Sequence, residues 1–113
     1  MTIKQLIEKV PKFEAICKAD FSREIKSVYC CDLLSIVMGR APADCAWVTV
    51  MGNLNSVAVA VLADISLIVI AENSSIDESA LAKAQIKEIN MIKTCLPIFD
   101  AAKLIDEGLS AND

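Results

Sequence analysis

The spacing of hydrophobic and polar residues predicts a helix at the start of the chain. Residues 3–10 carry apolar side chains at the i, i+3, i+4, i+7 positions that form one side of a helix. Thr2 and Gln5 match a capping box, in which the two side chains bond to each other's backbone N–H groups. Pro11 disfavours a longer helix, so we expect it to end there.

Two extended segments and a short helix follow. Apolar–polar alternation predicts a strand at 13–17, and residues that favour strands predict a second at 25–31. Asp32 suits the N-cap of a short helix after the second strand. Gly39 suits the left-handed residue that ends this helix.

From residue 45 onward, strands and helices alternate. Residues 45–51 are almost wholly apolar, which is typical of a strand buried on both faces. Periodicity alone allows residues 57–63 to be either a strand or a helix. We predict a helix, because Asn55 and Ser56 offer caps and a strand follows at 67–71.

The last part of the chain continues this alternation. Ser75 and Glu78 match a capping box and predict the start of a helix. We expect its inward side to carry three apolar residues, namely Ala82, Ile86 and Ile89. A short strand at 91–95 follows, and Pro97 lies just inside a final helix that runs to residue 109. We expect one side of this helix to be apolar, with Ile98, Ala101, Ala102, Ile105 and Leu109.

The order of these elements predicts the fold class. Strands near residues 45, 67 and 91 are separated by one helix each, which implies parallel neighbours with helices covering the sheet. We therefore expect an α/β protein with a single compact domain and a mixed, mostly parallel sheet. The domain should span residues 1–109, with a polar C-terminal tail at 110–113.

Composition and charge exclude several classes of function. The chain has 113 residues, a net charge of −4 and no His. An acidic chain gives no support for binding nucleic acid or an anionic membrane. The uncharged run between Asp44 and Asp64 is divided by the polar turn at 52–56, so it predicts two short buried elements and no membrane span.

The five cysteines indicate a reduced, cytoplasmic protein. Their number is odd, they lie in apolar strings, and no signal peptide precedes them. The adjacent pair Cys30 and Cys31 has no C-x-x-C spacing, so we expect no metal site. Buried, inert thiols are the favoured interpretation. The alternative is a redox-sensitive thiol at Cys30 or Cys31, close to the start of a helix.

No motif for catalysis or cofactor binding is present. The only glycines are Gly39, Gly52 and Gly108, which cannot form a P-loop or a dinucleotide fingerprint. Most carboxylates fall on polar helix faces or at caps, and nothing resembles a nucleophile elbow or a catalytic triad. We therefore expect a protein that is not an enzyme and has no cofactor.

A candidate ligand site lies in the loops after the central strands. In open α/β sheets, ligands bind beyond the carboxyl ends of parallel strands, where helix N-termini present free N–H groups. Small polar groups in these loops could hold an anionic or nucleotide-like ligand. They are Gly52, Asn53, Asn55, Ser56 and Asn73. The alternative, which we favour, is that these residues only form caps and turns.

Three segments resemble the DRTGG domain family: MTIKQLI at 1–7, SREI at 22–25 and VYCCDLLSIVMG at 28–39. The strand-and-helix units after them extend this likeness over nearly the whole chain. The family is similar in fold to the N-terminal domain of HPr kinase/phosphorylase, and it occurs beside CBS domains in some inorganic pyrophosphatases and within some phosphotransacetylases. The resemblance implies a stand-alone regulatory or assembly domain.

The resemblance also adds a candidate residue and two departures. The Asp-Arg pair of the family corresponds to Ser22 and Arg23, so Arg23 is a candidate for ligand binding. The Thr-Gly-Gly of the family falls at about 71–73, where this chain has Ala, Glu and Asn. If the family pocket binds nucleotide phosphates, we expect weak binding or none here, because the glycines are missing and Glu72 repels a phosphate.

Together these observations predict a regulatory or assembly module of a metabolic system. We expect it to act by self-association, as a homodimer or higher homo-oligomer, and by contact with a metabolic enzyme. A chain this small has limited interior for its 55% of apolar residues. The alternatives are a sensor of a nucleotide or phosphorylated metabolite, and a thiol redox switch.

Overall fold

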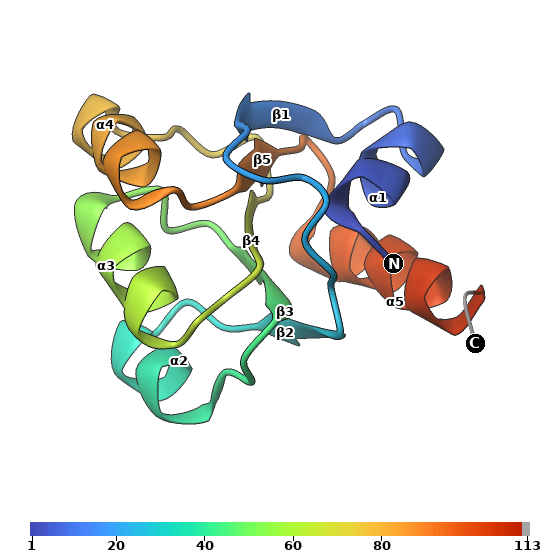
Figure 1. The fold of residues 1–113 in the computed structure, drawn as a ribbon, viewed down its shortest axis with the longest axis horizontal. Helices are drawn as coiled ribbons and strands as arrows, with labels where there is room; N and C mark the ends of the chain where they lie inside the picture. The colour runs from blue at the N-terminus through green and yellow to red at the C-terminus, as the bar shows by residue number, and fades with distance from the viewer. Residues whose placement is uncertain (112–113) are drawn as a thin grey trace.

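A five-stranded sheet separates two groups of helices in the computed structural model, which describes residues 1–111 (Figure 1). The strands are β1 (Glu14–Cys17), β2 (Ser27–Cys30), β3 (Cys45–Thr49), β4 (Leu67–Ile70) and β5 (Met91–Lys93). Their order is β1-β5-β4-β3-β2. The strands β2 to β5 are parallel, and β1 is antiparallel to β5. The predicted α/β fold with a mixed, mostly parallel sheet is confirmed.

The helices cover both faces of this sheet. They are α1 (Ile3–Lys9), α2 (Leu34–Arg40), α3 (Leu54–Leu62), α4 (Glu78–Lys87) and α5 (Ile98–Ala111). Figure 1 shows α1 and α5 on one side of the sheet and the other three helices on the opposite side. The predicted capping box of α1 is present, with Thr2 and Gln5 bonded to each other's N–H groups.

Two apolar cores lie on the two faces of the sheet. Along β3, Ala46 and Val48 pack in the core with α1 and α5, whereas Trp47 packs in the core with α2, α3 and α4. Trp47 is fully buried, and its indole N–H donates to the carbonyl of Cys31 at 2.8 Å. Burial on both faces explains the continuous apolar runs of β3 and β4.

Helix α3 confirms the choice of helix over strand for this segment. It begins after Asn53, whose side chain accepts a hydrogen bond from the Ser56 N–H. Val57 and Ala60, three residues apart, are both fully buried against the sheet. This spacing fits a helix and not the alternation of a strand.

The prediction for the ends of α2 was wrong. The N-cap position is Leu33, without a side-chain hydrogen bond, and Asp32 bonds to the neighbouring strand end instead. Gly39 lies inside the helix and has no positive φ, and Ala41 caps the end in an extended conformation. A tertiary contact therefore replaced the local capping role of Asp32.

The prediction for α4 was also wrong about where the helix begins and which side faces inward. The N-cap is Asp77, so Ser75 and Glu78 do not form a capping box. The inward side carries Ala80 and Ala84, which are fully buried. Ala82 and Ile86 are exposed, and only Ile89 of the expected apolar set is buried. Helix α4 therefore starts later than predicted and buries small alanines in place of Ile86.

The last helix has the predicted apolar side, with Ala101 and Ile105 fully buried. It continues to Ala111, so the first two residues of the predicted tail are helical. Residues 112–113 of that tail lie outside the described residues.

Candidate functional site

Three loops meet at the carboxyl ends of β3, β4 and β5. The backbone N–H of Glu72 donates to the carbonyl of Leu96 at 2.8 Å, and that of Asn73 donates to the carbonyl of Thr94 at 3.0 Å. The loops that carry Gly52, Asn53, Asn55, Ser56 and Asn73, which the sequence singled out for ligand binding, therefore lie at the same edge of the sheet. Arg23 is the exception.

Gly52 connects the first of these loops to the second. An isolated bridge pairs Gly52 with Ile76, and the N–H of Asp77 donates to the Gly52 carbonyl at 2.8 Å. A Cβ atom on Gly52 would lie 2.6 Å from the carbonyl oxygen of Ser75. A contact within the chain therefore requires glycine at this position.

Asn53 and Ser56 act as caps at the start of α3. The Asn53 side-chain oxygen accepts from the Ser56 N–H at 3.0 Å, and the Ser56 hydroxyl donates to the carbonyl of Met51. Asn55 is exposed in the first turn. The sequence left open whether these residues bind a ligand or only form caps and turns. The contacts of Asn53 and Ser56 are those of a helix cap.

Asp32, which the sequence predicts to be an N-cap, is another polar residue at this edge of the sheet. Its Oδ1 accepts from the Thr49 hydroxyl at 2.7 Å and from the Val50 N–H at 3.0 Å. Thr49 is fully buried at the end of β3. This carboxylate therefore ties the end of β2 to the end of β3.

Glu72 and Asn73 follow β4 in the left-handed conformation, with φ of 60° and 53°. These are the positions at which the resemblance places two glycines, the residue type that adopts this conformation most easily. The Glu72 carboxylate accepts from the N–H of Ile98 at 2.9 Å, at the start of the 14-residue α5. The anion-binding end of α5 therefore already holds a carboxylate of the chain itself.

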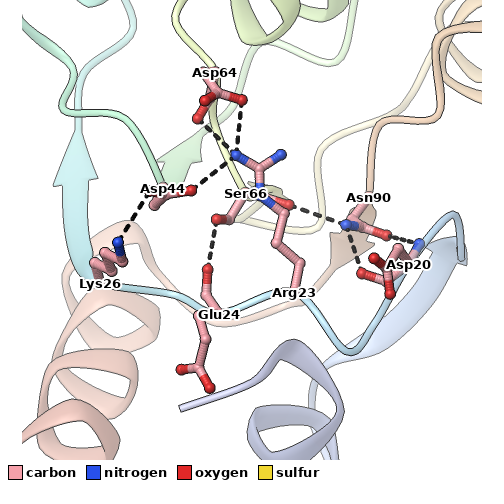
Figure 2. A network of polar contacts seen from close by, with 8 residues as sticks. All are labelled: Asp20, Arg23, Glu24, Lys26, Asp44, Asp64, Ser66 and Asn90. Carbon is pink, nitrogen blue, oxygen red and sulfur yellow. Dashed lines mark hydrogen bonds and ion pairs between the residues drawn. The ribbon is translucent and has the colours of Figure 1, made fainter.

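Arg23 lies at the opposite, amino edge of the strands (Figure 2). Its Nη2 donates to the Asp44 carboxylate at 3.0 Å, and to the Asp64 carboxylate and carbonyl at 2.9 Å each. Asp44 and Asp64 precede β3 and β4 and both have positive φ. The hydrogen bond from Arg23 holds the pKa of Asp44 below its usual value. Arg23 thus joins two strand starts, away from the loops at the carboxyl edge.

Asn90 extends this polar network on the same edge. Its side chain accepts from the N–H of Ala19 and of Asp20, and it donates to the carbonyls of Asp20 and Ser66. The Ser66 hydroxyl donates in turn to the carbonyl of Glu24 at 2.7 Å, as Figure 2 shows. Sequence reasoning missed Asn90. The only signal was a polar residue immediately before an apolar strand.

The paired cysteines lie at the end of β2. The expectation of buried thiols is wrong for Cys30, which is exposed, and Cys31 is only partly buried. Although much of Cys30 is exposed, its thiol is partly desolvated, and this desolvation and then the nearby Asp32 carboxylate raise the pKa of Cys30. A raised pKa favours the thiol over the nucleophilic thiolate at neutral pH.

The outer side of α3 is apolar and exposed, which sequence reasoning did not anticipate. Leu54, Ala58, Val61 and Leu62 lie on this side, and Leu62 is 71% exposed. Their spacing of i, i+4, i+7 and i+8 forms one stripe along the helix. The available signal was the absence of any charge in α3.

Two cavities lie between β2 and α5, away from the carboxyl-edge loops. One of about 520 Å³ extends toward Met1 and Glu24, and the other, of about 340 Å³, extends toward Phe99. Val28 and Asp106 line both cavities. The cavities therefore form one groove along the edge strand.

Residues 1–111 hold neither a metal-binding cluster nor a membrane-spanning helix. No cluster of three or more His, Cys, Asp or Glu side chains in this range could hold a metal ion. In the same range, no helix has the length and hydropathy needed to cross a membrane.

The fold is similar to that of a known regulatory region. No protein-family model matches the chain, and no curated protein does. A crystal structure of the CBS and DRTGG domains in the regulatory region of Clostridium perfringens pyrophosphatase, complexed with the activator diadenosine tetraphosphate, matches with a TM-score of 0.68 at 13% identity. The match covers 92% of this chain and 45% of that one, so this chain spans less than half of its length. The likeness to DRTGG-containing proteins is thus supported at the level of the fold.

Proposed function

We propose that the chain is a non-catalytic regulatory or assembly module that acts by self-association and protein contact. The exposed apolar side of α3 carries this proposal. The likeness to the regulatory region of an enzyme supports a regulatory role with a metabolic enzyme as a contact.

Helix α3 has the composition of a helix that is covered on all sides. Its nine residues, LNSVAVAVL, include no charge. Val57 and Ala60 are fully buried against the sheet, whereas Leu54 and Leu62 are exposed on the outer side. Since a helix that is apolar all round is normally buried, a protein surface is the expected cover for this stripe.

A second copy of the chain fits this stripe. Ala58 lies midway between Leu54 and Leu62, so the stripe has a small residue at its centre and a large one at each end. In an antiparallel pair of α3 helices, each Leu54 would meet the partner's Leu62 on either side of Ala58. A two-fold interface requires such a self-complementary surface.

Light scattering with two matched variants tests this proposal. We expect a wild-type mass of at least two chains at micromolar concentration. Leu62→Lys should lower this mass to half or less, because an ammonium group would enter the apolar contact. Ile86→Lys is the control, since Ile86 is 75% exposed and also lies in the last turn of its helix, outside the stripe. A wild-type mass of one chain, or equal effects of the two substitutions, would contradict the proposal.

A small-ligand sensor is the second candidate. It is favoured by the nucleotide activator bound in the similar regulatory region. A thermal-shift titration with diadenosine tetraphosphate and with ATP tests it. A ligand at a hundredfold excess over its dissociation constant stabilises the fold by about 2.7 kcal/mol. The Asn53→Ala/Ser56→Ala variant should lose this gain relative to its own ligand-free state if the loop after β3 binds the ligand. If neither compound raises the melting temperature, the assembly role is the remaining candidate.

A further inference from the structure

We propose that a second copy of the chain also binds along the outer edge of β2, so that the two sheets join into one. This inference rests on the proposed function in that the chain self-associates. It uses a surface separate from the exposed side of α3. The contact would be an antiparallel pair of β2 strands, flanked by two α5 helices.

The two edges of the sheet differ in their protection against pairing. The edge strand β1 has a bulge between Ala15 and Cys17 and carries the charged Glu14. The edge strand β2 reads Ser-Val-Tyr-Cys, without charge or proline, and pairs with β3 in unbroken register. Natural proteins block free edges with charges, prolines or bulges. The edge at β2 has none of these within the strand, as expected of an edge that is used.

The backbone of β2 presents two residues outward. The N–H of Lys26 donates to the carbonyl of Asp44, toward β3, whereas that of Ile25 donates to the carbonyl of Met1. Alternate residues of a parallel strand bond to the same neighbour. The N–H and C=O groups of Ser27 and Tyr29 therefore face the open edge.

Ser27 and Tyr29 are spaced so that a two-fold axis can pair them with the same residues of a second copy. With the axis at Val28, Ser27 lies opposite the partner's Tyr29, and Tyr29 lies opposite the partner's Ser27. Each pair can then exchange both backbone hydrogen bonds of an antiparallel ladder.

Helix α5 supplies charge complementarity beside this edge. Lys103 and Asp106 line the groove next to Val28. A two-fold axis perpendicular to the sheet keeps both α5 helices on the same face and makes them antiparallel. Lys103 would then lie opposite the partner's Asp106, and Asp106 opposite the partner's Lys103. The same contact would cover Phe99, which is 72% exposed beside the groove.

A charge exchange in the Leu62→Lys background tests the proposal, because that variant leaves β2 as the remaining interface. We expect this variant to have a mass of two chains and the wild type a mass of four or more. Adding Asp106→Lys should weaken the dimer by about tenfold in dissociation constant, since lysines would then face each other. Adding Lys103→Asp as well should restore the dimer. Equal dissociation constants for all three proteins in sedimentation would overturn the proposal.

Amide hydrogen exchange in the same variant locates the contact. The N–H groups of Ser27 and Tyr29 should exchange at least about tenfold more slowly at a concentration that gives dimer than at one that gives monomer. The N–H groups of Val28 and Cys30, which face β3, should be protected from exchange at both concentrations. Rapid exchange at Ser27 and Tyr29 in the dimer would overturn the proposal.

The same measurements separate the two proposals. If Leu62→Lys converts a wild-type dimer to a monomer, the proposed contact at β2 is wrong and self-association through α3 is supported. If Leu62→Lys leaves the mass unchanged while Asp106→Lys lowers it, the contact at β2 stands and the role of α3 fails. A monomeric wild type contradicts both.

Discussion

The carboxylate of Glu72 caps the backbone N–H of Ile98 across 26 positions of sequence, at an O···N distance of 2.9 Å. This contact places a negative charge from the loop after β4 at the start of α5. In α/β proteins such a helix start often receives the phosphate of a ligand. Here the chain fills that position with its own side chain, which favours a structural role for this loop.

Loss of the Glu72 carboxylate should destabilise α5. We expect Glu72→Ala to lower the free energy of unfolding by about 1 kcal/mol, the usual effect of losing a helix cap. Urea denaturation measures this change. Glu107→Ala, an exposed acid within α5, is the control and should change stability by at most a few tenths of a kcal/mol. Equal stability of the two variants would contradict the capping role.

Two glycines should respond in opposite directions to the same substitution. Gly52→Ala should destabilise by about 1–3 kcal/mol, because its Cβ would lie 2.6 Å from a backbone carbonyl oxygen. Gly39→Ala should stabilise by about 0.5–1 kcal/mol, since Gly39 lies inside α2 and nothing lies within 4 Å of the added Cβ. Thermal or urea unfolding of both variants checks the pair. A stable Gly52→Ala protein would show that the loop at 74–77 can move aside.

Removal of Arg23 should weaken the amino edge of the sheet. Arg23→Ala leaves the Asp44 and Asp64 carboxylates without their shared donor, and we expect a small decrease in the urea midpoint, because partly exposed ion pairs contribute little to stability. If Arg23 also bound an anionic ligand, the variant would lose ligand-dependent stabilisation as well. Urea unfolding with and without ATP distinguishes these outcomes. Unchanged stability would contradict a structural role for the Arg23 contacts.

Stability should fall in acid partly through Asp44. Since Arg23 holds the pKa of Asp44 below its usual value, the contribution is present above the unfolded pKa of about 3.9 and is lost as pH falls through the folded pKa. The wild type should therefore lose stability more steeply below about pH 4 than Asp44→Asn does. Urea midpoints measured from pH 6 to pH 2.5 test this, and parallel curves would contradict it.

The thiol of Cys30 should react slowly at neutral pH. Partial burial and the Asp32 carboxylate raise its pKa above the ordinary value of 9.0, so little thiolate is present at pH 7. Alkylation of a Cys31→Ala variant, followed by peptide mass spectrometry, should give a rate for Cys30 that still increases above pH 9. A plateau below pH 8 would instead support the redox switch.

The sequence alone predicted a large part of the fold because much of its signal is local. The capping box of Thr2 and Gln5, the buried strand predicted at 45–51 and found at 45–49, and the apolar side of α5 depend on residues close together in the chain. The sequence also selected loops that come together at one edge of the sheet, because the carboxyl ends of parallel strands always lie on the same side.

Only the tertiary structure decided what these polar residues contact. Asp32 suits an N-cap by sequence but bonds to Thr49 and Val50, and Arg23 bonds to two strand starts away from the loops. Likewise, the uncharged sequence of α3 does not tell which of its apolar residues are left exposed. Local patterns specify hydrogen bonds between near neighbours, whereas partners far apart in the chain, and the side of a helix left uncovered, depend on how the elements pack.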